Sequence, residues 1–231
     1  MILIAATAAQ AQSPSDVASK AQLFVDQVLV RWAENVSFTL HPAQKHPLNP
    51  LLKADQPWEG WRVEIYGNVL YDEDENIFKM WYIGEAPDHF PNYATYYATS
   101  KDGIRWEKPL VGGIQSAKGG QHNAVADACL LASVMKDKAE PDPSRRYKMV
   151  CWIQKPKPEG GPHTMVSPDG LHWTRLSTEP ICRSSDVITA YYDEARKLYV
   201  AFPKHSTAVR GQVRRCFAMS TSSDFLKWTE P

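Results

Sequence analysis

"SKDGIRWEKP" at residues 100–109 decides the fold, because the chain repeats its pattern twice more. "SPDGLHWTRLSTEP" follows at 167–180, and "SSDFLKWTEP" stands at 222–231. Each copy has Ser-x-Asp, a Trp four residues after the Asp, and then a Pro. The Asp residues are 67 and 55 positions apart (102, 169 and 224), and such recurrence indicates a repeated structural unit.

The segments between the copies also resemble one another. "RVEIYGNVLYD" at 62–72 alternates with period two, and "IFKMWYIG" at 77–84 corresponds to "RRYKMVCWI" at 145–153. "DVITAYYDEARKLYVAF" at 186–202 repeats the order strand, turn, strand. Short runs rich in Val, Ile, Tyr and Trp between polar turns predict antiparallel hairpins. Each unit then has about four strands, close to the roughly 40 to 50 residues of a propeller blade.

The repeated motif predicts a tight structural turn rather than three active sites. Its Asp carboxylate can accept backbone N–H bonds, and Gly103 and Gly170 can take positive φ. The third copy has Phe225 in place of Gly, which predicts a different turn there. The Trp is expected to fold back and pack between sheets. Five Trp at repeat positions are therefore expected in the core: Trp81, Trp106, Trp152, Trp173 and Trp228.

Composition excludes several classes of protein. Apolar residues make up 43% of the 231, as in an ordinary globular domain, and the formal net charge is zero. Neutrality gives no support for a nucleic-acid or membrane-surface partner, and no apolar run is long enough to span a bilayer. The four cysteines allow three disulfide pairings. Cys129–Cys151 is the best candidate pair, and four buried thiols are the alternative.

The two ends of the chain carry further expectations. Residues 1–11 have the apolar run and small-residue site of a signal peptide, which predicts a secreted or periplasmic protein. Residues 12–231 then form the propeller domain. Because the sequence closes on a repeat boundary, we expect it to hold the N-terminal blades of a longer protein. Residues 20–42 are ambiguous between a helix and strands, and strands are favoured.

Several stretches together carry a family resemblance. They are "LFVD" at 23–26, "KHPLNPLL" at 45–52, "PWEGW" at 57–61, "FKMWYIG" at 78–84, "ATSKDGIRWEKP" at 98–109, "DPSRRYKM" at 142–149 and "SPDGLHW" at 167–173. They resemble secreted bacterial proteins similar to the N-terminal domain of glycoside hydrolase family 32, in the five-bladed β-propeller group that includes family 43. The resemblance implies an all-β fold of the five-bladed β-propeller type, with about three blades in this chain. The Asn-Asp-Pro run of family 32 is absent from the first blade, so no sucrose or fructan specificity is implied.

Glycoside hydrolysis needs two carboxyl groups, and each expected innermost strand offers one candidate. The candidates are Glu64, Asp127 and Asp186. The resemblance implies a base or nucleophile in the first blade, a group that orients the sugar or tunes a pKa in the second, and a proton donor in the third. Alignment of the two "YD" pairs puts Glu64 on Ser185, one position short of Asp186, so the two acids need not be equivalent.

The alternative for each candidate acid is a surface carboxylate that only forms ion pairs. Four other acids fall in turns and are expected to be solvated: Asp72, Asp74, Asp193 and Glu194.

Other side chains are candidates for holding a sugar. Trp58 and Trp61 can stack on a pyranose ring, and His122 and Asn123 can bond its hydroxyls or cap a loop. Two arginines, Arg62 and Arg183, can clamp a carboxylate or sulfate on a sugar, or simply neutralise the acids. No cofactor is expected, and a calcium ion on the propeller axis would have no assignable ligands.

Three functions compete on this sequence. The leading one is an exported glycoside hydrolase-like protein that cleaves its carbohydrate substrate with paired carboxylates in the propeller funnel. A non-catalytic propeller that binds glycans or a protein is the alternative. A sialidase-like propeller is the third, and it requires an arginine triad and a tyrosine nucleophile that the sequence does not identify.

Overall fold

The computed structural model describes residues 26–28, 30–85, 93–112, 114, 121–156 and 158–231. The chain divides into two compact units, Met1–Lys45 and His46–Pro231. The described part of the first unit contains no helix or strand, so the strands expected over residues 20–42 are wrong for that part. The expected signal peptide lies outside the described residues. In the described chain, no helix is long and apolar enough to cross a membrane.

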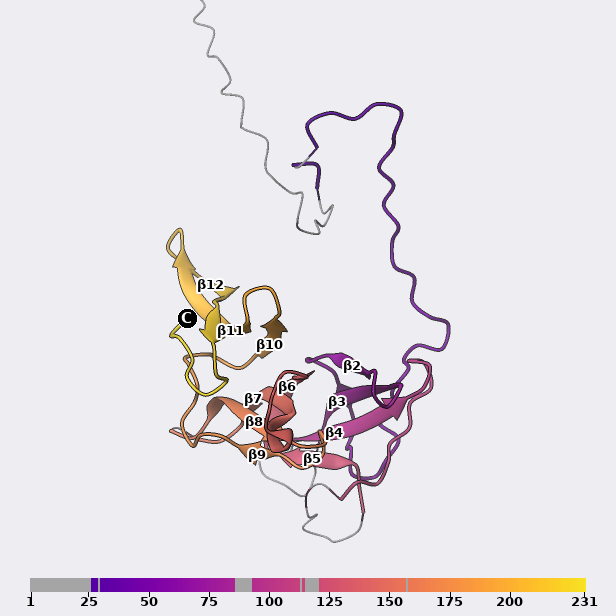
Figure 1. Cartoon of the computed structure of the whole chain (residues 1–231), viewed down its shortest axis with the longest axis vertical. Coiled ribbons are helices and arrows are strands. Elements are labelled where there is room, and N and C mark those ends of the chain that lie inside the picture. The colour runs from indigo at the N-terminus through magenta and orange to yellow at the C-terminus, as the bar shows by residue number, and fades with distance from the viewer. Residues whose placement is uncertain (1–25, 29, 86–92, 113, 115–120, 157) are drawn as a thin grey trace, which may run out of the picture. The chain divides into compact units, whose positions relative to one another are not determined.

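The second unit contains three antiparallel sheets, which confirms the all-β prediction (Figure 1). The first sheet has the order β1-β3-β4-β5, and β2 also pairs with β3. The second has the order β6-β7-β8-β9; in the third, β10-β11-β12, strand β13 also pairs with β11. The strands of the first sheet are β1 (Val63–Glu64), β2 (Val69–Asp72), β3 (Ile77–Glu85), β4 (Tyr93–Ser100) and β5 (Ala124–Asp127). Those of the second are β6 (Cys129–Lys136), β7 (Tyr147–Ile153), β8 (Gly161–Ser167) and β9 (Thr174–Arg175). Those of the third are β10 (Ile188–Asp193), β11 (Leu198–Val209), β12 (Gln212–Phe217) and β13 (Ser220–Ser222). A short 3₁₀ helix, η1 (Pro143–Arg145), lies between β6 and β7.

The sheets pack face to face through shared apolar cores. Trp81 and Tyr97 of the first sheet share one core with Met149 of the second. Val150 of the second sheet shares another with Ile188 of the third. Such strands are buried on both faces, which explains why β3 and β7 read as nearly continuous apolar runs. Of the five Trp expected in the core, Trp81 is fully buried and the other four are half-buried.

The repeated motif folds as the predicted turn. In the first copy, the Ser100 hydroxyl accepts a hydrogen bond from the backbone N–H of Gly103 at 2.9 Å. The Asp102 carboxylate accepts two more, from Ile104 and Arg105, at 2.8 and 2.7 Å. Trp106 folds back and donates its indole N–H to the Gly103 carbonyl at 3.2 Å. The Asp and Trp bonds recur in both later copies, so the motif is a structural turn.

The expectation of a different third turn is wrong. Phe225 adopts a φ of 64°, next to 72° and 79° for the glycines of the other two copies. A left-handed conformation costs a non-glycine residue roughly 1–2 kcal/mol. The Phe225 ring is fully buried and packs edge-on against Tyr199 at 4.9 Å and Trp228 at 5.7 Å. This apolar burial offsets the backbone cost, so the turn keeps its shape without glycine.

Buried ion pairs tie each sheet to the next. Asp72 of β2 binds Lys79 of the same sheet at 2.8 Å and, across the interface, Lys136 and the Tyr147 hydroxyl, both at 2.5 Å. Burial would raise the pKa of Asp72, but these hydrogen bonds outweigh it and hold the pKa well below the usual range. A second set joins the second and third sheets: Asp137, Lys148 and Tyr199.

These ties correct one expectation about the turn acids. Asp72 is buried rather than solvated, because two lysines and a tyrosine replace its water. Asp193 is half-buried beside Arg196. The expectation is confirmed for Asp74 and Glu194, whose side chains are 69% and 78% exposed.

All four cysteines are free thiols, so the candidate Cys129–Cys151 disulfide is not formed. Three are buried and Cys216 is half-buried, close to the alternative of four buried thiols. They pack as small apolar side chains, and burial raises the pKa of Cys151 and of Cys182.

His163 should make stability fall as the pH drops below about 6.5. Its ring is fully buried between the carbonyls of Glu159, at 2.8 Å, and Ser177, at 3.2 Å. Burial lowers the pKa of His163 despite these carbonyls, so the unfolded chain takes up the proton first and gains stability in acid. Urea unfolding at pH 7.5 and 5.5 should show a smaller loss for His163→Gln than for the parent or for the exposed His172→Gln. Equal losses in all three proteins would contradict the prediction.

Candidate functional site

Each of the three candidate acids lies at or just before the first strand of a sheet. Glu64 ends β1, and Asp186 lies two residues before β10. Asp127 ends β5 of the first sheet and is separated from β6 of the second only by Ala128, which has a φ of 53°. Asp127 pairs with the first sheet, so the expectation of one acid per innermost strand stays a prediction.

The register separates Glu64 from Asp127. Val63 pairs with Gly84, Gly84 with Ala94, and Ala94 with Asp127 in one row across the first sheet. Three inter-strand steps amount to about 14 Å. Glu64 is one position along its strand from Val63, so it points to the opposite face from Asp127. Paired glycosidase carboxylates lie about 5–10 Å apart, so these two acids do not form such a pair.

Asp186 is held as an ion rather than as a proton donor. Its two carboxylate oxygens accept hydrogen bonds from the Lys204 ammonium and from the Val187 backbone N–H. Burial would raise the pKa of Asp186, but these two partners outweigh it and lower the pKa. A general acid needs the reverse shift, so this geometry does not support the proton-donor role implied for the third blade.

Three predicted residues meet at the start of the first sheet. Trp61 is 71% exposed, and the Arg62 guanidinium carbon lies 4.6 Å from the centre of its ring. Arg62 also forms an ion pair with Glu64 at 3.0 Å and bonds the Tyr93 hydroxyl at 3.4 Å. An exposed aromatic face beside a guanidinium and a carboxylate can stack on a sugar ring and bond its hydroxyls. We call Trp61, Arg62, Glu64 and Tyr93 the Trp61 cluster.

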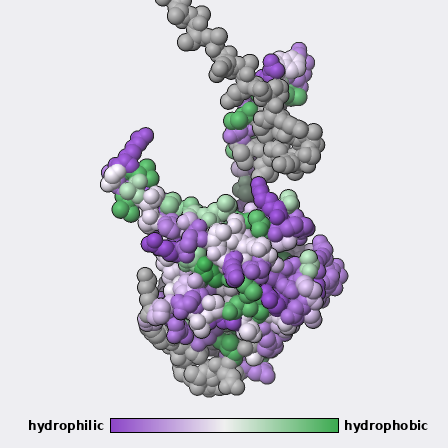
Figure 2. All heavy atoms as spheres, turned by 60° about the vertical axis from the view of Figure 1, so that its left-hand side comes forward, coloured by the Kyte–Doolittle hydropathy of each residue, from purple (hydrophilic) through white to green (hydrophobic). Residues whose placement is uncertain are grey.

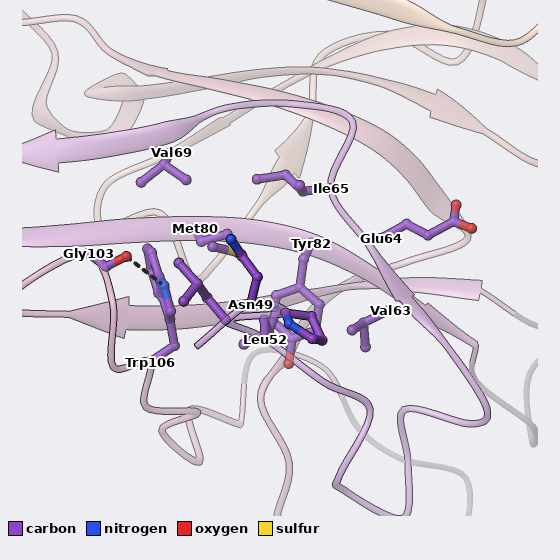
Figure 3. Close-up of a pocket in the computed structure, with 12 residues that line it drawn as sticks. Asn49, Leu52, Val63, Glu64, Ile65, Val69, Met80, Tyr82, Gly103 and Trp106 are labelled. Carbon is purple, nitrogen blue, oxygen red and sulfur yellow. Dashed lines mark hydrogen bonds between the residues drawn. The ribbon is translucent and has the colours of Figure 1, made fainter. Parts of the chain in front are cut away.

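An apolar hollow of about 320 Å³ lies beside β1 (Figure 3). Its wall includes Val63, Val69, Met80, Tyr82 and Trp106. Figure 3 shows the Glu64 carboxylate pointing away from Val69, Met80 and Trp106. The carboxylate therefore belongs to the Trp61 cluster, and the hollow offers apolar surface instead of acid chemistry.

Asn123 and His122 are buried and use polar atoms within the fold. Asn123 is fully buried: its amide oxygen accepts from the Trp58 indole at 2.7 Å, and its amide nitrogen donates to the Tyr82 hydroxyl at 2.6 Å and the Tyr97 carbonyl at 2.8 Å. His122 is buried and accepts from the Ala124 backbone N–H at 3.2 Å. These polar atoms serve the fold, and the substrate-binding role expected for both residues stays a prediction. Trp58 is likewise committed to Asn123.

Sequence reasoning missed the buried carboxylate of Glu59. It accepts hydrogen bonds from the Tyr82 hydroxyl at 2.5 Å, the Lys108 ammonium at 2.8 Å and the backbone N–H groups of Asp55 and Gln56, both at 3.0 Å. Burial and the Glu59 carboxylate raise the pKa of Tyr82. With all these partners, Glu59 anchors the segment that ends in Trp61. Its position between two Trp in "PWEGW" gives no signal of burial.

Arg183 lies apart from the Trp61 cluster, in the loop before β10. It is exposed and, with Ser184 and Ser185, lines two neighbouring cavities of about 770 and 220 Å³. Trp152 of β7 lines the larger one, so it is not simply a core residue. Within the described ranges, no three His, Cys, Asp or Glu side chains are grouped to hold a metal ion.

No protein-family model and no curated protein matches this sequence. Solved structures do match its fold. A β-fructofuranosidase from Schwanniomyces occidentalis complexed with fructosyl-erythritol is 14% identical over 77% of this chain and 35% of its own length, with a TM-score of 0.53. Fructan 1-exohydrolase IIa from Cichorium intybus is 11% identical over 80% and 37%, with a TM-score of 0.51.

A third match acts on sugars by a different reaction. An N-acetylgalactosamine deacetylase from F. plautii, in complex with blood group B trisaccharide, is 16% identical over 79% of this chain and 56% of its own, with a TM-score of 0.52. This chain therefore spans about a third to just over half of the matched structures. The likeness confirms a fold of the β-propeller type found in glycoside hydrolases.

Proposed function

We propose that this chain forms part of an exported glycosidase-like β-propeller protein, in which the Trp61 cluster holds a sugar and Glu64 acts as base or nucleophile. The observation that carries the proposal is the cluster itself: an exposed Trp, with Arg62 stacked on it and ion-paired to Glu64 at 3.0 Å. The carbohydrate-bound structures of the same fold support a sugar ligand.

Each residue of the cluster has a defined task in the proposal. Trp61 stacks on the apolar face of the sugar, and Arg62 bonds ring hydroxyls with the donors that Glu64 leaves free. Arg62 also fixes the direction of the Glu64 carboxylate, whose side chain is 35% exposed and open to a ligand. Because Asp186 is held ionised and Asp127 faces away, neither is assigned as the proton donor.

A non-catalytic glycan-binding propeller is the second candidate. One observation favours it: the register keeps Glu64 and Asp127 from forming a carboxylate pair. The same cluster would then hold the sugar without cleaving it. Fold alone does not decide between the two, since one fold can support different chemistry.

Glu64→Gln should separate the two candidates. If Glu64 takes part in catalysis, the change lowers kcat/KM at least about 100-fold on a hydrolysed aryl glycoside or polysaccharide. Binding of the same sugar, measured by calorimetry, should change only a few-fold. Glu73→Gln is the matched control, because Glu73 is 68% exposed and pairs with Lys138 in a turn.

Trp61→Ala completes this test, because it should weaken sugar binding under both candidates. Full hydrolysis by Glu64→Gln would overturn the catalytic assignment. A parent protein that binds sugars through Trp61 but cleaves none of the panel would establish the second candidate. Sugar binding unaffected by Trp61→Ala would refute both.

A further inference from the structure

Positive charge is concentrated in the third sheet although the chain is neutral overall. Residues 195–223 contain six Lys and Arg and no Asp or Glu. Four of the six lie on or between β11 and β12: Lys204, Arg210, Arg214 and Arg215. Such a stretch attracts anions over a longer range than any single side chain does.

Strands β11 and β12 present these cations on a two-stranded ribbon (Figure 1). Strand β11 pairs with β10 as far as Pro203, and from Lys204 to Val209 it pairs with β12. Arg215 pairs with Ser206, two positions from Lys204, so Lys204 and Arg215 lie on one face of the ribbon. Arg210 and Gly211, with φ of 51° and 75°, form the tight turn at the tip.

A cavity of about 220 Å³ lies at the base of this ribbon, and each residue that lines it has a polar or charged side chain. The lining residues are Arg183, Ser184, Ser185, Lys204, His205 and Ser206. The Lys204 carbonyl accepts hydrogen bonds from the Ser185 backbone N–H at 3.0 Å and from the Ser184 hydroxyl at 3.2 Å. These bonds hold the loop that carries Arg183 against β11, so the cavity is preformed.

Arg183 supplies an uncommitted guanidinium. Among the described residues, its side chain has no hydrogen-bond or ion-pair partner, whereas the Lys204 charge is matched by Asp186. Arg183 also lines the adjoining cavity of about 770 Å³, with Trp152, Lys155 and Glu230. Lys155 is paired with Glu159 at 3.0 Å, so among the Lys and Arg side chains that line the two cavities Arg183 is left to bind an anion.

Hydrophobic side chains occur as small patches among hydrophilic ones on the face drawn in Figure 2. We call the two adjoining cavities that Arg183 lines the Arg183 cavity. It is more specific than such scattered patches, because serine hydroxyls, the Arg183 guanidinium and an aromatic side chain line it. Guanidinium groups bind carboxylates and sulfates with two parallel hydrogen bonds, and serine hydroxyls add further donors. A sugar ring can rest on the neighbouring Trp152.

We infer that the Arg183 cavity binds the anionic substituent, carboxylate or sulfate, of an acidic glycan, and that the β11–β12 ribbon holds the following part of the chain. The glycan part of this inference rests on the proposed function. The inference that an anion binds here depends only on the positive charges of the third sheet and the loop before it.

The test measures binding of matched oligosaccharides by calorimetry: a uronate oligomer, a sulfated oligomer and a neutral oligomer of equal length. We expect an acidic oligomer to bind at least tenfold more tightly than the neutral one. The two acidic arms identify whether carboxylate or sulfate is preferred. Affinity for the preferred arm should fall at least tenfold in Arg183→Gln and fall with rising salt.

Arg105→Gln is the control, since it removes the same charge from an exposed turn of the first sheet. An equal loss in Arg183→Gln and Arg105→Gln, or equal binding of neutral and acidic oligomers, would overturn the inference. Tighter binding of a single-stranded oligonucleotide than of either acidic glycan would do the same. Glu64→Gln should keep the preference for the acidic over the neutral oligomer, so failure of the proposed catalytic role would be seen separately.

Discussion

Asp72→Ala will lower the free energy of unfolding by about 3–5 kcal/mol, because it removes the buried carboxylate that Lys79 and Lys136 share. The Lys79 side chain is only 2% exposed and would keep the turn acid Glu75 and a hydrogen bond to the Tyr147 hydroxyl at 2.9 Å. Lys136, from the second sheet, would keep only Asp74. The two sheets then lose a shared anion that satisfies donors on both sides. Urea unfolding followed by tryptophan fluorescence measures the change.

Asp74→Ala is the control for this prediction, since Asp74 is 69% exposed and belongs to the same turn. Exposed ion pairs contribute about 0–1 kcal/mol, so its effect should be much smaller. The double variant Asp72→Leu with Lys79→Met should recover part of the loss, because apolar groups replace the separated charges. Equal effects of Asp72→Ala and Asp74→Ala would show that the network does not hold the sheets together.

Trp81→Ala will cost about 3–5 kcal/mol, the usual penalty for removing a large buried aromatic side chain. The Trp81 ring packs against Tyr97 at 5.5 Å and against Tyr147 of the second sheet at 6.3 Å. Its indole donates to the carbonyl of Gly170, in the second repeated turn, at 2.8 Å. The residue therefore joins one sheet to the turn of the next. Thermal and urea unfolding measure the loss.

Trp61→Ala is the matched control for Trp81→Ala, because it removes the same ring from a 71% exposed position. Exposed substitutions of this kind stay within about 0.5 kcal/mol. Trp81→Phe should fall between the two. It keeps an apolar ring, and Trp173 still donates to the Gly170 carbonyl at 3.0 Å. A Trp81→Ala loss no larger than that of Trp61→Ala would contradict the assigned packing.

The repeated turns and hairpins could be predicted because they depend on local chemistry. The Ser-x-Asp pattern fixes hydrogen bonds within a few residues, and the strand segments around "FKMWYIG" carry their own periodicity. At Phe225 the local sequence was not sufficient to predict the turn. Its left-handed φ is stabilised by Tyr199, which is distant in sequence, so a rule based on glycine alone gave the wrong turn.

The candidate site could be predicted only where neighbours in sequence are neighbours in space. Trp61, Arg62 and Glu64 meet because they are consecutive or nearly so at the start of β1. The burial of Asn123 could not be predicted, because the sequence around a polar residue does not show whether its side chain faces a ligand or is buried. Its partners Trp58 and Tyr82 come from other segments.

The pairing of buried charges could not be predicted from the sequence either. Lys79 and Lys148 stand in apolar strands where an exposed lysine would be the ordinary reading. Both are buried because each pairs with an Asp: Lys79 pairs with Asp72 of β2, and Lys148 pairs with Asp137, which directly follows β6. The same limit applies to Asp186, which precedes β10 while its partner Lys204 lies on β11.

The Ser-x-Asp turn carries most of the bonds that shape it within its own residues. Such a turn can form wherever its own residues recur, although the copy with Phe225 also needs the contact with Tyr199. The hairpins between copies are then free to grow or shrink, as their unequal spacing shows. The strands and connecting loops can therefore differ in length from copy to copy while the backbone of the bend keeps its shape.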